Sequence, residues 1–276
     1  MIEVREFRDK KLVEYLQPGM KVLIRFDIPY KGMGDCVMFM PLYERLKVLY
    51  PSVEFSLYTV SSQQDYFGDN YHQDMKFDYV FYLTFYEYNM YDDTGRMSKP
   101  EICCVKELGI PFTADIEFTW RPKNTYSRFI GVSFQCNSDP RTNVHPDTAK
   151  IIWDCIKFEN MIPIEITFTH PQFNKVNQPF PFIDLSLRNS PATIENAVSA
   201  IASCRAFVGV NTGTFCVAVS MFPERVLQLN TGKPFTPYKR INPINSILTG
   251  LPFKFPVEEF KRWIRCMRDN IEYQSK

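Results

Sequence analysis

Short runs of almost wholly apolar residues recur along this chain, and segments with helical periodicity separate them. Strands that are apolar on both faces are typical of a sheet that helices cover on both sides, which favours a parallel α/β sheet over a half-exposed antiparallel one. In the first half of the chain the pattern predicts strands at 21–28, 53–60 and 77–83, and helices at 36–50 and 100–110.

A second series of the same kind follows residues 111–128, a stretch with two prolines and few periodic positions that we interpret as a linker. The series consists of predicted strands at 129–134, 162–169, 206–210 and 225–229 and predicted helices at 145–160, 191–204 and 213–222. Residues 257–273 have the pattern of an amphipathic closing helix.

Two successive alternations of strand and helix predict two doubly wound, Rossmann-like α/β lobes that face each other across a cleft. We expect an N-terminal lobe at 1–118, a C-terminal lobe at 119–250, and a C-terminal helix at 251–276 that packs back across the lobes. Such sheets bind ligands at the carboxyl ends of their strands, so we expect the functional residues there.

Composition excludes several classes of function. The 32 basic and 31 acidic residues leave a formal charge of +1, which gives no overall field for nucleic acid or an anionic membrane. No apolar run is long enough to span a bilayer, and the first residues lack the apolar core of a secretory signal. We therefore expect a cytoplasmic protein without a membrane span, and peripheral membrane association stays open.

The eight cysteines have no C-x-x-C spacing and are accompanied by only three histidines. Structural zinc sites and disulfide frameworks need more regular ligand spacing. We therefore expect reduced cysteines, no metal site and no cofactor.

The loop between the first strand and the first helix, KGMGDC at 31–36, contains two glycines and an acid. Gly32 and Gly34 permit positive φ and let a ligand approach the backbone, and Asp35 lies at or near the helix N-cap. The spacing fits neither a dinucleotide fingerprint nor a phosphate loop. Asp35 is either a helix cap alone or a functional carboxylate that faces the cleft.

Three segments resemble glycosyltransferase family nine, the ADP-heptose:lipopolysaccharide heptosyltransferases. Residues 20–60 are similar to the family's opening, 129–156 to the segment where donor phosphates meet polar groups, and 193–239 to its signature segment. In the opening segment the matching residues, in the family's order and spacing, are Gly34, Asp35, Pro41, Tyr50 and Pro51.

The resemblance implies a two-lobed fold of the GT-B type and an inverting, metal-independent transfer of a sugar from a nucleotide diphosphate. In the family, the residue that matches Asp35 is regarded as the general base that deprotonates the acceptor hydroxyl. Gly32 and Gly34 would then form the acceptor-side loop.

Donor phosphates are usually held by amides at a helix N-terminus together with cations. The segment Asn211, Thr212, Gly213 and Thr214 lies between a predicted strand and a predicted helix and offers such amides. The alternative is a simple N-cap formed by Asn211 or Thr212.

The donor segment departs from the family at two positions. Asn211 stands where most members have Asp, and Cys216 stands where many have His. An amide cannot carry the same charge as a carboxylate, so the donor sugar can differ from the family's and activity can be altered.

Two cations are further donor candidates. Arg141 lies near the position of a family lysine that contacts the donor phosphate, or is a solvated loop residue. Lys233 either reaches the cleft or is an ordinary surface lysine. His145, next to a proline, is interpreted as a loop or cap residue.

The aromatic-rich stretch 77–93 is either a rim on which an acceptor stacks or a packed strand followed by a tyrosine-rich loop. The expected partners are a nucleotide sugar, with ADP as one candidate for its nucleotide, and a sugar or glycoconjugate acceptor. A nucleotide-sugar epimerase or hydrolase and a non-catalytic nucleotide-sugar binder remain alternatives to a transferase.

Overall fold

The structure, a computed structural model, describes residues 1–25, 33–59, 75–84, 87–88, 97–112, 127–136, 143–167, 182–184, 199–210, 212–230, 245–248 and 255–271. The chain divides into two compact units. The first contains Met1–Thr119 with Pro237–Arg240, and the second contains Trp120–Thr236 with Ile241–Lys276.

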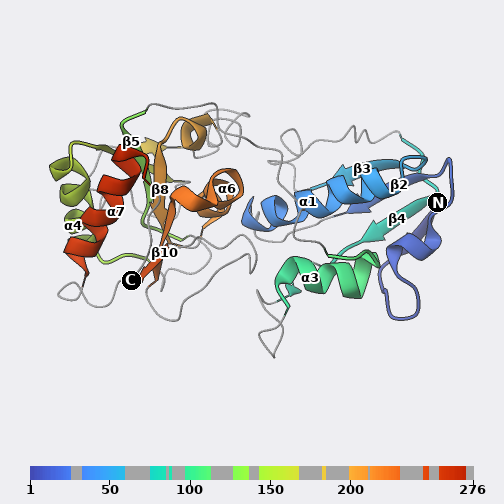
Figure 1. Cartoon of the computed structure of the whole chain (residues 1–276). Helices are drawn as coiled ribbons and strands as arrows, with labels where there is room; N and C mark the ends of the chain where they lie inside the picture. The colour runs from blue at the N-terminus through green and yellow to red at the C-terminus, as the bar shows by residue number, and fades with distance from the viewer. Residues whose placement is uncertain are drawn as a thin grey trace. The chain divides into compact units, whose positions relative to one another are not determined.

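The first unit is built on a four-stranded sheet in which all neighbouring strands are parallel, in the order β1-β4-β2-β3 (Figure 1). Its strands are β1 (Ile2–Val4), β2 (Lys21–Arg25), β3 (Glu54–Tyr58) and β4 (Tyr79–Tyr82). Its helices are the 3-10 helix η1 (Leu12–Tyr15), α1 (Met33–Leu49), α3 (Lys99–Cys103) and the π-helix η3 (Cys104–Leu108), which continues α3 without a break.

The long helix α1 supplies much of the apolar core of this unit. Phe39, Tyr43 and Leu46 are fully buried, and their spacing of four and three residues places them on one helix face. From the sheet, Val22 and Ile24 of β2 are also fully buried. Because β2 lies between β3 and β4, its central residues are buried, whereas Lys21 at its start is exposed.

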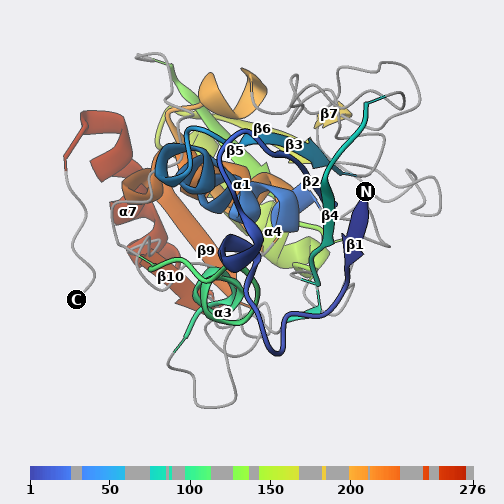
Figure 2. The same ribbon diagram turned by 90° about the vertical axis from the view of Figure 1, so that its right-hand side faces the viewer.

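The second unit contains a six-stranded parallel sheet in the order β10-β9-β8-β5-β6-β7. Counted from β5, this is the doubly wound order 3-2-1-4-5-6. The strands are β5 (Phe129–Ser133), β6 (Ile162–Thr167), β7 (Phe182–Asp184), β8 (Ala206–Gly209), β9 (Val226–Asn230) and β10 (Asn245–Leu248). The helices are α4 (Pro146–Phe158), α6 (Gly213–Met221), the short 3-10 helix η6 (Pro223–Arg225) and α7 (Val257–Asp269). Figure 2 labels α4 and α7 in a view turned by 90° from Figure 1.

One face of this sheet packs against α4 and α7, which also contact each other. Val132 of β5 and Val208 of β8 point to this face, where they meet Trp153 and Trp263 in one buried cluster. On the opposite face Phe207 is fully buried, and a Cβ at Gly131 would lie only 2.7 Å from its ring. The glycine therefore makes room for an aromatic ring on the neighbouring strand.

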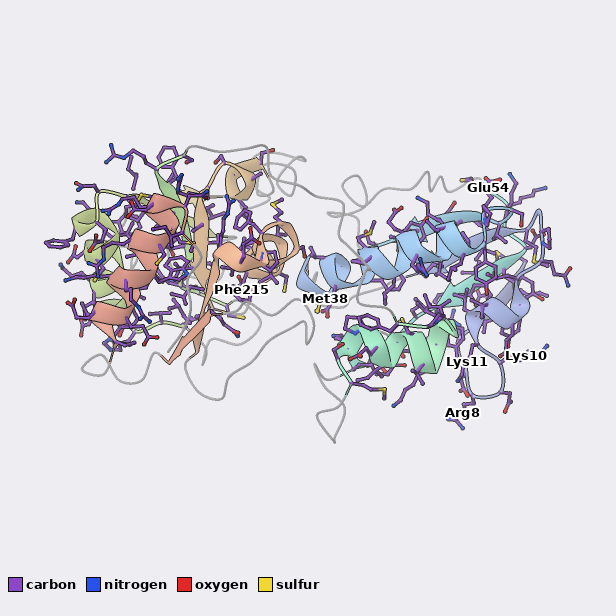
Figure 3. All side chains as sticks on the ribbon, in the orientation of Figure 1. Arg8, Lys10, Lys11, Met38, Glu54 and Phe215 are labelled. Atoms are coloured by element: carbon purple, nitrogen blue, oxygen red, sulfur yellow. The ribbon has the colours of Figure 1, made fainter. Side chains whose placement is uncertain are left out.

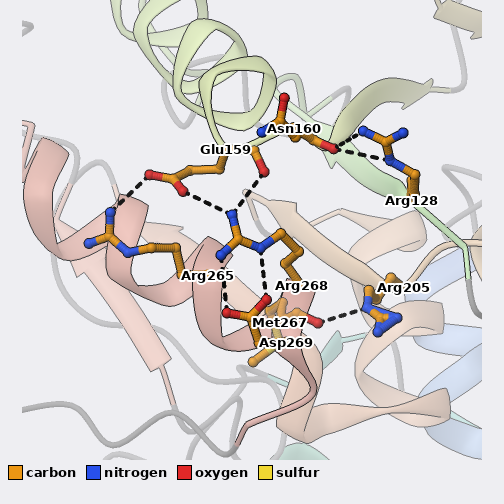
Figure 4. Close-up of polar contacts among 8 residues, drawn as sticks. All are labelled: Arg128, Glu159, Asn160, Arg205, Arg265, Met267, Arg268 and Asp269. Carbon is orange, nitrogen blue, oxygen red and sulfur yellow. Dashed lines mark hydrogen bonds and ion pairs between the residues drawn. The ribbon is translucent and has the colours of Figure 1, made fainter.

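A polar network ties the end of α7 to the amino edge of the second sheet (Figure 4). Arg205, just before β8, donates from Nε to the carbonyl oxygen of Met267 at 2.7 Å. Glu159, at the end of α4, accepts from Arg265 at 2.9 Å and from Arg268 at 3.5 Å. These contacts fix the last turns of α4 and α7 against each other.

The predicted fold class, two doubly wound α/β units, is confirmed. Each predicted strand and helix of the described residues is present, with ends that differ by a few residues. Three short strands, β1, β7 and β10, were not predicted. The domain limits at 118 and 250, and the packing of residues 251–276 across both lobes, stay predictions.

Candidate active site

The strand order locates one switch point in each sheet. In the first sheet the chain runs from β2 to β3 on one side and returns to β4 on the other. In the second sheet β6 and β7 extend to one side of β5, and β8 lies on its other side. Doubly wound sheets bind ligands outside the carboxyl ends of the strands at such points. The functional groups should therefore follow β2 and β4 in one unit, and β5 and β8 in the other.

Asp35 lies in the first turn of α1, the helix that follows β2. Its Oδ1 accepts a hydrogen bond from Lys99 Nζ at 2.6 Å, and the two side chains are only 18% and 5% exposed. Burial raises the pKa of the Asp35 carboxyl, and the Lys99 ammonium partly opposes that rise. The result is a desolvated carboxylate that retains one charged partner.

Lys99 is the first residue of α3, and the local sequence Ser-Lys-Pro-Glu explains why a helix begins there. Ser98 and Glu101 form a capping box, in which Glu101 Oε2 accepts from the Ser98 backbone N at 2.6 Å and from its hydroxyl at 2.8 Å. Pro100 is suited to the first helical turn. A lysine in that turn opposes the helix dipole, so a nearby carboxylate is favourable.

A second buried carboxyl lies near the end of β4. Glu107 of η3 accepts hydrogen bonds from the backbone N and the hydroxyl of Thr84, both at 2.7 Å, and from Cys103 Sγ at 3.5 Å. Burial raises the pKa of Glu107, and burial together with the Glu107 charge raises the pKa of Tyr88. Lys99, Cys103 and Glu107 follow one another at intervals of four residues, so the helix places polar groups along the first switch point.

At the second switch point the groups are hydroxyls and helix amides. Ser133 ends β5, and its Oγ lies 3.4 Å from Oγ1 of Thr212, the N-cap of α6. Thr212 Oγ1 accepts from the Phe215 amide at 3.2 Å and lies 2.9 Å from Thr214 Oγ1. Phe215 is fully buried and anchors this first turn (Figure 3).

The first turn of α6 carries no acidic side chain. The positive end of the helix dipole is therefore not neutralised within the helix, which favours an external anion such as a phosphate. The capping interpretation is confirmed for Thr212, and the cap leaves the amides of Gly213 and Thr214 for other acceptors.

Several predicted site residues lie outside the described residues, namely Gly32, Arg141, Asn211 and Lys233. Gly34 is the second residue of α1 and is partly buried. His145 caps α4, because its Nδ1 accepts from the Asp147 amide at 3.3 Å. This outcome agrees with its interpretation as a cap residue.

The sequence-based interpretation missed Lys99, Ser133 and Glu107. The Ser-Lys-Pro-Glu capping box was the available signal for Lys99. Of the aromatic stretch 77–93, the structure describes 77–84 and 87–88, where Tyr79 and Phe81 contact Tyr15 as strand packing.

Among the described residues, no three His, Cys, Asp or Glu side chains lie together as metal ligands. In the same part of the chain, no helix combines the length and apolar character needed to cross a membrane.

No protein-family model and no curated protein sequence matches the chain. Solved structures do match. A family 9 glycosyltransferase from Veillonella parvula DSM 2008 superposes with a TM-score of 0.58 at 12% identity, covering 85% of this chain and 88% of its own. Escherichia coli ADP-heptose LPS heptosyltransferase II gives a TM-score of 0.55 at 13% identity, covering 91% and 99%.

A third match is TibC from enterotoxigenic E. coli, described as an iron-containing dodecameric glycosyltransferase. Its TM-score is 0.52 at 12% identity, and the superposition covers 78% of this chain but 60% of TibC. At these identities the likeness establishes the fold: the two units have the architecture of family nine glycosyltransferases, as the resemblance predicted.

Proposed function

We propose that this protein is a glycosyltransferase that moves a sugar from a nucleotide diphosphate donor to an acceptor hydroxyl, with inversion and without a metal ion. The observation that carries the proposal is the desolvated Asp35 carboxylate at the switch point of the first sheet. A carboxylate of this kind has the properties of a general base, because burial raises its proton affinity.

In the proposed reaction the acceptor oxygen attacks the anomeric carbon of the donor sugar. The acceptor proton passes to Asp35, the new glycosidic bond forms, and the bond to the diphosphate breaks. The nucleoside diphosphate leaves with the bonding electrons, and its added charge needs stabilisation.

The donor phosphates are assigned to the N-terminus of α6 in the second unit. The amides of Gly213 and Thr214 and the hydroxyl of Thr212 supply donors at the positive end of the helix dipole. Asn211, Arg141 and Lys233 complete the proposed donor site on sequence grounds alone.

The first donor to test is an ADP-linked heptose, because one structural neighbour is named as an ADP-heptose heptosyltransferase. The acceptor is proposed to be a sugar or glycoconjugate, and the location the cytoplasm. Metal independence needs its own test, since TibC is described as iron-containing. Activity should survive EDTA and should not correlate with bound iron.

Donor binding is measured first, by native mass spectrometry against ADP-, UDP-, GDP-, CMP- and dTDP-sugars. Thr212→Ala is expected to weaken binding of the cognate donor, whereas Thr212→Ser, which keeps the capping hydroxyl, retains it. Asp35→Asn is expected to leave donor binding unchanged. Failure to bind any of these donors would contradict the proposal.

Chemistry is tested by release of nucleoside diphosphate with and without a panel of sugar acceptors. Asp35→Asn is expected to lower acceptor-dependent turnover by about 100- to 10,000-fold, the usual contribution of a general base. Release of nucleoside diphosphate without an acceptor would favour a hydrolase, and conversion of the donor to its epimer without net release would favour an epimerase. Binding without any turnover would favour a non-catalytic nucleotide-sugar binder.

A further inference from the structure

The pair formed by Asp35 and Lys99 joins residues that are 64 positions apart in the sequence. Lys99 lies on α3 and Asp35 on α1, and both side chains are largely removed from water. Removing two charges from water costs free energy, which their mutual attraction often does not recover. A buried ion pair is therefore weak evidence of a stabilising role. Its position at a switch point calls for a functional explanation.

The contact leaves the two carboxylate oxygens unequal. Oδ1 of Asp35 is bound to the Lys99 ammonium at 2.6 Å, whereas no described hydrogen bond involves Oδ2. A carboxylate oxygen has lone pairs available for a second partner. The bound oxygen therefore fixes the side chain, and Oδ2 is available to accept a proton.

Among the described residues, the other titratable groups near the pair have different partners or little charge. The Glu101 carboxylate accepts from Ser98, and Glu107 accepts from Thr84. Burial raises the pKa of the Cys36 and Cys103 thiols, which keeps both uncharged at neutral pH. Lys99 is thus the cation that lowers the proton affinity of Asp35 against the effect of burial.

We propose that Lys99 is a positioning residue for Asp35: its ammonium holds Oδ1, favours the ionised carboxylate, and leaves Oδ2 to take the proton of the acceptor hydroxyl. The role rests on the proposed transferase function, in which Asp35 is the general base. Without Lys99 the buried carboxyl would remain protonated over a wider pH range and could not accept the proton.

The direct test is a pH titration of Asp35 in protein labelled with ¹³C at the aspartate side-chain carboxyl. The Asp35 signal is identified by its loss in Asp35→Asn. In the wild type the midpoint should lie below pH 7. Lys99→Met should move the midpoint upward by about one pH unit or more, and Lys99→Arg should largely restore it.

Lys106→Met is the matched control, because Lys106 is an exposed lysine on the continuation of the same helix. It should leave the midpoint in place. Far-UV circular dichroism checks that each variant is folded. If Lys99→Met does not fold, the titration of the wild type remains a test, since an Asp35 midpoint above pH 7 in the wild type overturns the proposed role of Lys99.

The kinetic test is the pH dependence of kcat/KM. Lys99→Met should move the acid limb to higher pH and recover activity in alkaline buffer, with KM for the donor unchanged. A purely structural role would instead lower activity at every pH. If the Asp35 midpoint in Lys99→Met equals that of the wild type, the role of Lys99 is overturned, whether or not the wild type transfers a sugar. If the midpoint shifts but the wild type shows no transfer, the proposed function is overturned instead.

Discussion

Replacing Glu165 with Gln tests what a carboxyl group inside a parallel sheet does to stability. Glu165 lies in β6, between β5 and β7, and is almost completely buried. Burial raises its pKa from the ordinary value of 4.5 to about 7. The folded protein therefore keeps a proton on Glu165 at pH values at which the unfolded chain has released it.

The sign of the effect follows from proton binding. Below about pH 4.5 both states are protonated, and Glu165 imposes no penalty. Between pH 4.5 and 7 the folded state binds more protons, so stability falls as pH rises, and above pH 7 the loss is constant. Each pKa unit corresponds to about 1.4 kcal/mol, so the full loss is about 3.5 kcal/mol.

Glutamine resembles the protonated acid at every pH. Between pH 5 and pH 8, the free energy of unfolding of the wild type should fall by about 2.5 kcal/mol relative to Glu165→Gln. Comparing the change with pH, rather than one absolute value, removes any constant effect of the amide on packing. The matched control is Glu258→Gln on α7, because the Glu258 side chain is 82% exposed.

Urea unfolding followed by tryptophan fluorescence is the suitable assay. All three tryptophans belong to the second unit, and Trp153 and Trp263 lie in its core, so the signal reports the unit that contains Glu165. Parallel pH profiles for the wild type and Glu165→Gln would refute the assigned pKa. A control variant that diverged from the wild type to the same extent would refute the attribution to burial.

Two further substitutions test packing and capping. Gly131→Ala should destabilise the second unit by about 1–3 kcal/mol, measured by the same urea assay, because the added Cβ would lie 2.7 Å from the buried Phe207 ring; an unchanged midpoint would show that the ring moves freely. Ser98→Ala should lower the stability of α3, the helix that carries Lys99, by about 1 kcal/mol. Hydrogen exchange across 98–108 should then become roughly fivefold faster, and unchanged exchange would contradict a capping role.

The sequence predicted those parts of the fold that local pattern determines. Mostly apolar runs predicted β2, β3, β5 and β6 and also the four-residue strands β4 and β8, because each run has a local pattern that a sequence can show. The strands β1, β7 and β10 contain three or four residues, and each lies at the edge of its sheet, where it pairs with a single neighbour. No local pattern marks such an edge strand, so these were missed.

The site residues also differ in whether a local sequence pattern marks them. Asp35 and Thr212 were recognisable because each accompanies a strand-to-helix turn, and turns have local signatures. Lys99 was not, since its partner is far away in the sequence and only packing of α1 against α3 brings them together. The burial of Glu165 was also hidden, because a single acid in an apolar run does not reveal which side chains cover it.

The arginine contacts around Glu159 and Met267 hold the end of α7 at the amino edge of the second sheet, whereas Ser133 and Thr212 lie at its carboxyl edge. A fluorophore or surface linker attached just after α7, for example through Ile271→Cys, would therefore be anchored on the side of the sheet opposite to the donor residues. Ile271 is exposed, whereas seven of the eight native cysteines are buried. In protein immobilised in this way, the linker would not occupy the carboxyl edge of the second sheet, where Ser133 and Thr212 lie.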